Sequence, residues 1–426
     1  MNKIVQRALK PLVGRAEIPA DKSLSHRAVM FASLAKGTSI IKNFSKGADC
    51  SSTVSVCRQL GVLINYQDDK TLEIISEGVL APSASALDCG NSGTTMRLMS
   101  GILAGQDFSS TLVGDESLSK RPMLRVIKPL SEMGAKIVSQ EGKAPLEIKG
   151  ASLCAIKYNS PLASAQVKSC ILLAGLCADG VTTFVEPEKS RDHTERMLIA
   201  MGADLTVVGN AVSVKPSVLQ PIDFKVPGDI SSAAFFIVSA LIIPDSDITL
   251  VNVGLNPTRT GIIDVAIRMG ANISVYNLRE ELGEPVGDIR VRYSKLKATE
   301  ISGADIPRLI DELPVIAVLA SQAEGRTIIK DASDLRNKEA DRITTVVDAM
   351  KKFGASIEET PDGFVIDGKT DLYGGCVVDS FHDHRLAMSY YVAGLIAQKP
   401  IEINGFEWIN ISFPEFESLM GELQSA

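Results

Sequence analysis

The spacing of apolar residues divides the chain into six similar blocks. In each block a run of small and aliphatic residues predicts a buried helix, and a short β-branched segment after it predicts a strand. The first block has a polar entry at residues 21–27, a helix expected over residues 28–35, a break at Gly37 and a strand over residues 38–43. Because the same order recurs along the chain, we expect a repeat protein of the α/β class.

Each block is predicted to contain two helices. The first half begins with one helix, and the second half contains the other, which ends at a glycine in the first five blocks. The first halves of the six blocks are predicted to begin near Lys22, Asn91, Ser164, Asp229, Asp311 and His384, and each leads into a helix. The strands that follow them are expected at residues 40–41, 111–113, 183–185, 248–251, 327–329 and 400–403. The second halves of the first five blocks end with a glycine that suits a helix C-terminus, namely Gly61, Gly134, Gly202, Gly270 and Gly354. The sixth block stops short at residues 413–416.

Two similar segments, residues 17–21 and 225–229, mark predicted domain boundaries. A chain of 426 residues is longer than one hydrophobic core usually supports, so two domains are expected. One is predicted to hold three repeats in residues 20–226. The other combines residues 1–19 with three repeats in residues 227–426, and the active site is expected in the cleft between the two. The alternative organisation is a single elongated array of repeats.

Composition narrows the class of protein. Hydrophobic residues make up 45% and charged residues 22% of the chain, which is typical of a soluble globular protein, and no apolar run is long enough to span a bilayer. We therefore expect a cytoplasmic protein. A net charge of −7 argues against nucleic-acid binding. Seven cysteines without a C-x-x-C pair favour reduced thiols, with Cys170 and Cys177 on a buried helix face.

Cations gather at the predicted helix openings, where unpaired backbone N–H groups attract anions. They are Lys22, Arg27, Arg97, Lys120, Arg121, Lys168, Arg191, Lys338, Arg342 and Arg385. Of these, Lys22, Arg121, Lys338 and Arg385 are placed at helix starts, where a cation opposes the helix dipole and a bound anion would offset the cost. The alternative is a solvated surface of mixed charge. The whole set favours a site for an anionic ligand.

Spacing within these openings suggests individual roles. Ser23 and Arg27 are four residues apart, as are Lys338 and Arg342, so each pair is predicted to share one helix face. The acid Asp311 precedes an apolar helix, and Glu339 lies among cations in residues 336–342.

Each acid could act as a base, an acid or a stabiliser of charge. Alternatively, Asp311 caps its helix and Glu339 pairs with Arg336 or Arg342. The pair His382 and His384 could suggest a metal, but no third ligand lies nearby in the sequence.

Five motifs together resemble the 5-enolpyruvylshikimate-3-phosphate (EPSP) synthase family. They occupy residues 21–27, 90–97, 120–122, 336–342 and 383–385, and the similarity extends over essentially the whole chain. Further stretches at residues 164–169, 191–195 and 256–261 are similar to the class II subgroup.

The resemblance implies a two-domain, inside-out α/β barrel of six βαβαββ repeats, three in each domain. It also implies transfer of the enolpyruvyl group of phosphoenolpyruvate to the 5-hydroxyl of shikimate 3-phosphate, with release of phosphate. No cofactor or metal is expected. The implied partners are these two anionic substrates, without nucleic acid or membrane, and the protein is expected to be a monomer that closes its domains on binding.

The resemblance carries over individual residues. The implied catalytic residues are Asp311 as base towards the hydroxyl, and Glu339 with Lys22 for the methylene proton. Implied contacts of shikimate 3-phosphate are Lys22, Ser23, Arg27, Ser164, Ala165, Gln166, Arg191, Asp311 and Lys338. Implied contacts of phosphoenolpyruvate are Lys22, Asn91, Gly93, Thr94, Arg121, Gln166, Arg342 and Arg385.

Some positions depart from the class I pattern: Ala165 replaces a serine, Asp334 an asparagine and Ile411 a lysine. The last two fit class II. Gly93 stands where glyphosate-tolerant members often carry alanine, and the glycine alone does not decide sensitivity to that inhibitor. Two other functions stay open from the sequence: enolpyruvyl transfer to UDP-N-acetylglucosamine, and a non-catalytic phospho-ligand-binding protein on the same scaffold.

Overall fold

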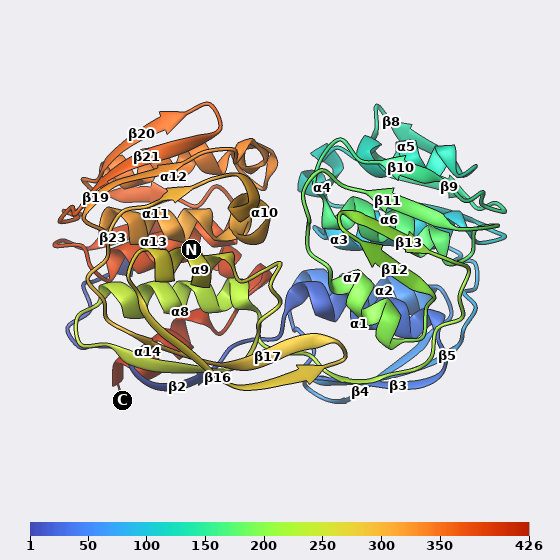
Figure 1. Ribbon diagram of the computed structural model, residues 1–426, viewed down its shortest axis with the longest axis horizontal. Coiled ribbons are helices and arrows are strands. Elements are labelled where there is room, and N and C mark those ends of the chain that lie inside the picture. Colours follow the sequence, from blue (N-terminus) through green and yellow to red (C-terminus); the bar gives the residue numbers. More distant parts are fainter. Residues whose placement is uncertain (426) are drawn as a thin grey trace. The chain divides into compact units, whose positions relative to one another are not determined.

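The computed structural model describes residues 1–425, which form two compact units (Figure 1). Unit 2 contains residues 20–226 and the short segment 280–284. Unit 1 contains residues 1–19, 227–279 and the chain from Pro285 onward. Each unit encloses a contiguous hydrophobic core of its own. No helix within residues 1–425 is long and apolar enough to cross a membrane.

Unit 2 is built from three sheets and the helices that pack against them. Its helices are α1 (Lys22–Leu34), α2 (Ala48–Gln59), α3 (Gly93–Ala104), α4 (Glu116–Lys120), α5 (Leu124–Glu132), α6 (Ala165–Gly175) and α7 (His193–Ala200). One sheet has the order β14 (Asp223–Lys225), β3 (Lys36–Lys42), β5 (Thr71–Glu77), β4 (Leu63–Asp68). The next has the order β6 (Leu87–Asp88), β7 (Ser109–Val113), β9 (Lys143–Lys149), β8 (Lys136–Gln140). The third has the order β10 (Lys157–Asn159), β11 (Thr182–Val185), β13 (Ala211–Val214), β12 (Leu205–Val208).

Unit 1 repeats this plan. Its helices are α8 (Ile230–Ile242), α9 (Gly261–Arg268), α10 (Ile306–Leu309), α11 (Leu313–Ser321), α12 (Arg342–Lys352), α13 (His384–Gly394) and α14 (Phe416–Ser425). Two sheets have the orders β16 (Asn272–Glu281), β17 (Glu284–Arg292), β15 (Asp247–Gly254), β2 (Val13–Glu17) and β18 (Glu300–Ile301), β19 (Gly325–Ile329), β21 (Gly363–Gly368), β20 (Ser356–Thr360). The last sheet has the order β1 (Asn2–Val5), β23 (Ile401–Asn404), β22 (Val377–Asp379).

The sheets share one pairing rule, which explains the short sixth block. In each complete sheet the first strand of the repeat pairs in parallel with a short strand on one side and antiparallel with a returning strand on the other. In the sixth sheet β23 pairs in parallel with β22. Its antiparallel partner is not a returning strand but the N-terminal strand β1, in the register Ile4↔Glu402. The first residues of the chain therefore complete its last repeat.

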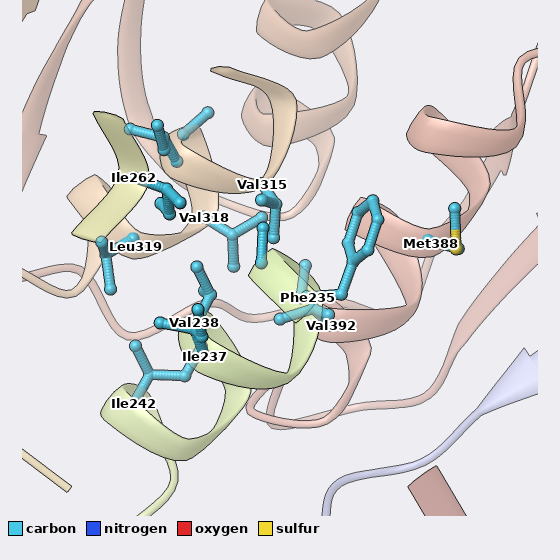
Figure 2. Packing of buried hydrophobic residues seen from close by; sticks show 14 of the residues in the cluster. Phe235, Ile237, Val238, Ile242, Ile262, Val315, Val318, Leu319, Met388 and Val392 are labelled. Carbon is cyan, nitrogen blue, oxygen red and sulfur yellow. The ribbon is translucent and has the colours of Figure 1, made fainter. Parts of the chain in front are cut away.

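The cores are made by helices that are apolar on all sides. Helix α8 is buried at every position except Ser232, and all nine residues of α11 are buried. In Figure 2 side chains of α8, α11 and α13 interdigitate, with Phe235 facing Val392 and Val318 above Val238. Because such helices have no polar face to give to solvent, they occupy the centre of the unit and the sheets lie outside them. This is an inside-out α/β arrangement.

The structure confirms the predicted repeat units and corrects several details. All six opening helices are present, and the five second-half glycines all have positive φ, between 88° and 99°, as a helix C-terminal glycine does. The first helix starts earlier than predicted, at Lys22, because Asp21 Oδ1 accepts a hydrogen bond from the Leu24 amide at 2.8 Å. Gly37 is no break, since β3 runs through it. After residue 413 the chain forms the further helix α14.

Four of the seven cysteines are buried, as expected of small core residues. Cys170 lies on the buried face of α6, and burial raises the pKa of its thiol above the ordinary value. The expectation for Cys177 is wrong: helix α6 ends at Gly175, so Cys177 lies beyond the helix and is exposed.

Candidate active site

In unit 2 the start of α1 presents Lys22 and Ser23, both partly exposed. A lysine in the first turn opposes the helix dipole, and the structure offsets this with an ion pair between Lys22 and Asp49. A carboxylate of the chain therefore already offsets part of the cost for which a bound anion was expected. Lys22 remains 29% exposed in its side chain and so is accessible to a second anion.

Arg27, one helical turn later, is almost fully buried and ties three helices together. Its Nε donates to Thr194 Oγ1 of α7 at 2.8 Å, its Nη2 to Ser169 Oγ of α6 at 2.9 Å, and its Nη1 to the Ser23 carbonyl at 3.0 Å. Burial lowers the pKa of Arg27 from 12.5 to about 10, so the guanidinium stays charged at neutral pH. Arg27 therefore fixes the position of Ser23.

The start of α3 holds a second group, in which hydrogen bonds orient the polar side chains. Arg97 Nη1 donates to Gln166 Oε1 at 2.6 Å, and Gln166 Nε2 donates to Thr94 Oγ1 at 3.0 Å. Arg121 Nη2 donates to Asn91 Oδ1 at 2.9 Å. These contacts bring together the predicted residues of α3, α6 and the segment after α4. Through its hydrogen bond to Oε1, Arg97 orients the side-chain amide of Gln166.

Gly93, the first residue of α3, leaves room for two of these arginines. A Cβ atom at this position would lie 2.8 Å from Arg97 Nη1 and 3.6 Å from Arg121 Nη1. Because Arg97 is held against Gln166, it has little freedom to move aside. The glycine therefore preserves the arrangement of cations at this helix start.

We expect Gly93→Ala to raise the KM for phosphoenolpyruvate about fivefold, since a close overpacked contact costs on the order of 1 kcal/mol. The KM for shikimate 3-phosphate should change less. Steady-state kinetics would measure both. Gly421→Ala is the matched control, because a Cβ there meets nothing within 4 Å. An unchanged KM in Gly93→Ala would contradict the steric role of this position.

Ser164, Ala165 and Gln166 lie at the start of α6, where Ser164 is the N-cap. All three are partly exposed, and the first-turn amides of this helix are available to an anion. Arg191 is also partly exposed and lies on the segment between β11 and α7.

The prediction that Lys168 is one of the cations facing a ligand is wrong. Its side chain is fully buried, with Nζ 2.7 Å from Glu186 Oε1 and 2.7 Å from Glu195 Oε1. Burial raises the pKa of the Glu195 carboxyl although Lys168 opposes the shift. Lys168 Nζ also donates to the Ser190 carbonyl at 3.3 Å, and Glu186 accepts from the Ser190 amide at 3.0 Å and hydroxyl at 2.5 Å. The cluster thus fixes the residue next to Arg191.

Ser190→Ala removes the hydroxyl bond to the Glu186 carboxylate. We expect the free energy of unfolding to fall by about 1.5–3 kcal/mol, as for other hydrogen bonds to charged groups. Affinity for shikimate 3-phosphate should fall as well, because the neighbouring Arg191 is one of the contacts that the resemblance implies, while the KM for phosphoenolpyruvate stays near the parent value. Urea titration and calorimetry would measure the effects. Ser418→Ala, which removes an exposed hydroxyl bond to the Glu415 carbonyl, is the control.

In unit 1 the predicted residues meet around Asp311. Its Oδ1 lies 3.3 Å from Lys338 Nζ and 3.3 Å from Arg342 Nη1. The Arg385 guanidinium donates to the Asp311 carbonyl at 3.3 Å and to Ser231 Oγ at 2.8 Å. A carboxylate in this position can accept a hydrogen bond or a proton from a hydroxyl group brought next to it.

Arg342 is the centre of the charge network, with only 2% of its side chain exposed. Its Nε donates to Asp383 Oδ2 at 2.7 Å and its Nη2 to Glu339 Oε2 at 2.7 Å. Burial alone would lower the pKa of the Arg342 guanidinium, but the carboxylates of Asp383, Glu339 and Asp311 outweigh burial and raise that pKa. Arg342 is therefore a permanent cation that holds both candidate catalytic acids.

Two buried acids of this network are missed by sequence reasoning. Asp383 is fully buried, pairs with Arg342 and accepts from the Arg385 amide at 2.9 Å as the N-cap of α13. Glu312 is also buried, accepts from Ser231 and lies 3.6 Å from Arg385 Nη1. Asp383 belongs to the motif at residues 383–385 and Glu312 directly follows Asp311, and these are the signals that could have indicated them.

Several local expectations for these residues are wrong. Arg121 is the C-cap of α4 and Lys338 precedes α12, so neither lies at a helix start, and Lys338 and Arg342 do not share a helix. The expectation that Asp311 caps its helix is wrong, because the N-cap residue of α11 is Glu312. The alternative that Glu339 pairs with Arg342 is confirmed.

The histidines of residues 382–384 have separate environments. His382 stacks on Trp408 with ring centroids 4.5 Å apart, whereas His384 is buried as the first residue of α13. Within residues 1–425 no three His, Cys, Asp or Glu side chains are grouped so that they could hold a metal ion.

Comparison with known proteins identifies the family. The sequence pattern of EPSP synthase (3-phosphoshikimate 1-carboxyvinyltransferase) matches residues 6–420. The chain belongs to the EPSP synthase family. It is 57% identical to the 3-phosphoshikimate 1-carboxyvinyltransferase of Geobacillus kaustophilus over 95% of this chain and 96% of that protein. It is 52% identical to the enzyme of that name in Bacillus subtilis, over 97% and 98% of the two chains.

Solved structures agree with this family. EPSP synthase from Acinetobacter baumannii superposes with a TM-score of 0.90 at 44% identity, covering 99% of this chain and 98% of that one. The enolpyruvyl transferase NikO from Streptomyces tendae has a TM-score of 0.79 at 15% identity, over 99% and 97%, which shows a shared fold.

The chain is thus an enolpyruvyl transferase of the shikimate pathway. It transfers the enolpyruvyl group of phosphoenolpyruvate to the 5-hydroxyl of shikimate 3-phosphate. Transfer to UDP-N-acetylglucosamine is not favoured.

Proposed function

We propose that the two groups of residues, one from unit 2 and one from unit 1, act on the same pair of substrates. The observation that carries this proposal is the pair of acids Asp311 and Glu339, held by Arg342 and supplied with further cations by Lys338 and Arg385. Unit 2 adds the cations and amides at the starts of α1, α3 and α6. Both substrates carry phosphate and carboxylate groups, which such positions attract.

Shikimate 3-phosphate is assigned to one set of residues. They are Lys22, Ser23, Arg27, Ser164, Ala165, Gln166, Arg191, Asp311 and Lys338. In this assignment Asp311 accepts the hydrogen of the 5-hydroxyl, while the first-turn amides of α6 and the nearby cations hold the phosphate. Arg27 is only 3% exposed, so most of its effect comes from fixing Ser23, Ser169 and Thr194.

Phosphoenolpyruvate is assigned to a second set. It consists of Lys22, Asn91, Gly93, Thr94, Arg121, Gln166, Arg342 and Arg385. The guanidinium of Arg342 already contacts three carboxylates, so in the proposal a substrate anion exchanges with one of them. Arg385, with 15% of its side chain exposed, is the more accessible of the two arginines in unit 1.

The reaction then proceeds by addition and elimination. A proton is added to the methylene carbon of phosphoenolpyruvate by Glu339 with Lys22, Asp311 takes the proton of the 5-hydroxyl, and the oxygen bonds to the enol carbon. The tetrahedral intermediate loses a proton from the same methyl carbon and expels phosphate as the carbon–oxygen bond breaks. The surrounding arginines and Lys22 stabilise the charge on the phosphate and carboxylate as it changes.

The deciding experiment measures phosphate release from phosphoenolpyruvate in the presence of EDTA, with either shikimate 3-phosphate or UDP-N-acetylglucosamine as acceptor. Release with shikimate 3-phosphate alone supports the proposal. Tight binding of shikimate 3-phosphate without release would instead favour a non-catalytic binding protein and make Asp311 and Glu339 structural. We also propose that the active form is a cytoplasmic monomer that needs no cofactor, which sedimentation of the active protein would test.

A further inference from the structure

A cavity of about 700 Å³ lies in unit 1 at the C-terminal ends of its three central helices, α8, α11 and α13. The predicted active-site residues of this unit lie at or before the N-terminal ends of the same helices or of α12. The cavity therefore shares none of the residues assigned above. Its volume is in the range of small-molecule sites in proteins.

The same arrangement at the ends of three repeated helices forms the walls of the cavity. Each central helix ends against a backbone segment that leaves a sheet, and the segment's amide caps a helix carbonyl. The Ala8 amide donates to the Leu395 carbonyl at 2.8 Å, the Ser294 amide to the Leu241 carbonyl at 3.1 Å, and the Thr370 amide to the Ser321 carbonyl at 2.8 Å. Since backbone amides satisfy these helix ends, no side chain of the three segments is needed to cap them, and neighbouring side chains line the cavity.

The floor of the cavity is apolar and the rim is charged. Leu241, Ile243, Leu296, Leu372 and Leu395 form buried parts of the floor. Each of the three segments contributes one exposed cation beside its capping residue: Arg7, Lys295 and Lys369. Lys10 adds a fourth cation, and the rim also contains three exposed acids, Asp245, Glu324 and Asp371.

None of these seven charged side chains forms an ion pair with another residue of the described chain (1–425), although both signs line one cavity. Elsewhere on unit 1, exposed charged side chains do form ion pairs: Arg326 Nε, for example, lies 2.7 Å from Asp367 Oδ1. With four basic and three acidic groups the lining has a net charge of only +1, so a ligand with a single charge of either sign would meet repulsion along with attraction. A ligand that carries both charges next to an apolar body would be attracted by all three features.

We propose that this cavity is a binding site for a small zwitterion with an apolar body, which is the chemistry of a free α-amino acid with a large apolar side chain. The carboxylate of the ligand contacts the cations at Lys295 and Lys369, its ammonium group contacts the rim acids, and its side chain covers the leucine floor. The site is separate from enolpyruvyl transfer and does not depend on the assignments made for that reaction.

A structural alternative exists for the cations alone. Positive side chains near helix C-termini stabilise a helix through its dipole, without any ligand. The two explanations differ in one measurement. If the cations serve only the helices, neutralising them lowers the melting temperature of the protein without ligand. If they serve a ligand, the melting temperature without ligand is unchanged.

Calorimetric titration of the full chain, with shikimate 3-phosphate at saturation, tests the proposal with L-phenylalanine as the probe. We expect one site per chain with a Kd below about 1 mM. Phenylpropionate, which lacks the ammonium group, and phenethylamine, which lacks the carboxylate, should each bind at least about fivefold more weakly, and glycine should not bind. Absence of binding by L-phenylalanine at 10 times that concentration, or equal binding of all four compounds, would overturn the proposal.

Two variants locate the site. The double variant Lys295→Gln, Lys369→Gln should weaken L-phenylalanine binding at least about fivefold and leave the melting temperature without ligand unchanged. Gln398→Trp, at an exposed lining position, should fill the cavity and abolish binding. Lys351→Gln, an exposed lysine of α12 outside the cavity, is the matched control. Full binding in both test variants, or a lowered melting temperature in the double variant with binding intact, would assign the cations to the helices and overturn the site.

Discussion

Replacing Asp311 by alanine is expected to lower the rate of phosphate release by about 10³-fold, the size of effect that loss of a general base produces. The physical reason is that Asp311 is the acid to which we assign the proton of the 5-hydroxyl, with Lys338 Nζ and Arg342 Nη1 each 3.3 Å from its Oδ1. Affinity for shikimate 3-phosphate should stay within about tenfold of the parent, equivalent to about 1.4 kcal/mol, because the other assigned contacts remain. Rapid-quench kinetics and calorimetry would measure the two quantities.

Asp311→Asn separates proton transfer from the size and hydrogen bonding of the side chain. The amide keeps the size of the side chain and can still accept a hydrogen bond, but it cannot take the proton of the 5-hydroxyl. It should therefore be as inactive as the alanine variant. Asp334→Asn is the matched control, because Asp334 lies near the same lysine, 3.7 Å from Lys338 Nζ, and is more exposed. Turnover within threefold of the parent (roughly 0.7 kcal/mol) in Asp311→Asn would rule out its role as the base.

Replacing Arg342 by leucine is expected to lower the free energy of unfolding by about 3–5 kcal/mol, since it leaves buried charge without its partner. Asp383 is fully buried and loses both of its contacts with the guanidinium, and Glu339 and Asp311 lose one contact each. An effect of this size is a large part of the stability of an ordinary domain. Equilibrium unfolding in urea, followed by circular dichroism, would measure it.

The control for this variant is Arg326→Leu. Arg326 also makes paired contacts with a carboxylate, at 2.7 and 2.8 Å from Asp367, but that pair is exposed. Water screens an exposed pair, so the midpoint of unfolding should remain near that of the parent. If both variants unfold at the same urea concentration as the parent, the buried network does not stabilise unit 1 and Arg342 is not its structural centre.

The repeat architecture could be predicted because it depends on local signals. An apolar helix such as α8, a strand after it and a glycine at a helix end each leave a pattern in a few residues. Glycine at position 270, for instance, predicts the end of α9 through the backbone conformation that it allows, and the structure gives it a φ of 93°. Such features require no knowledge of distant contacts.

Partners distant in sequence could not be predicted in this way. Lys168 has the same local setting as a ligand-binding cation at a helix start, and only the fold brings Glu186 and Glu195 to it and buries all three. Asp383 and Arg342 are 41 positions apart, and neither sequence neighbourhood indicates that they pair. Burial decides the role of a charged residue, and burial is set by tertiary packing.

The last repeat of unit 1 has a consequence for how the protein is made. Strand β1 leaves the ribosome first, but its partner β23 is among the last segments to be synthesised, and the bond between Asn2 and Glu402 joins residues 400 positions apart. At ordinary rates of translation β1 waits on the order of tens of seconds for that partner. Most of unit 2 has been synthesised by Val226 and is free to fold in that interval. While β1 waits, its unpaired edge is open to mispairing with another nascent chain.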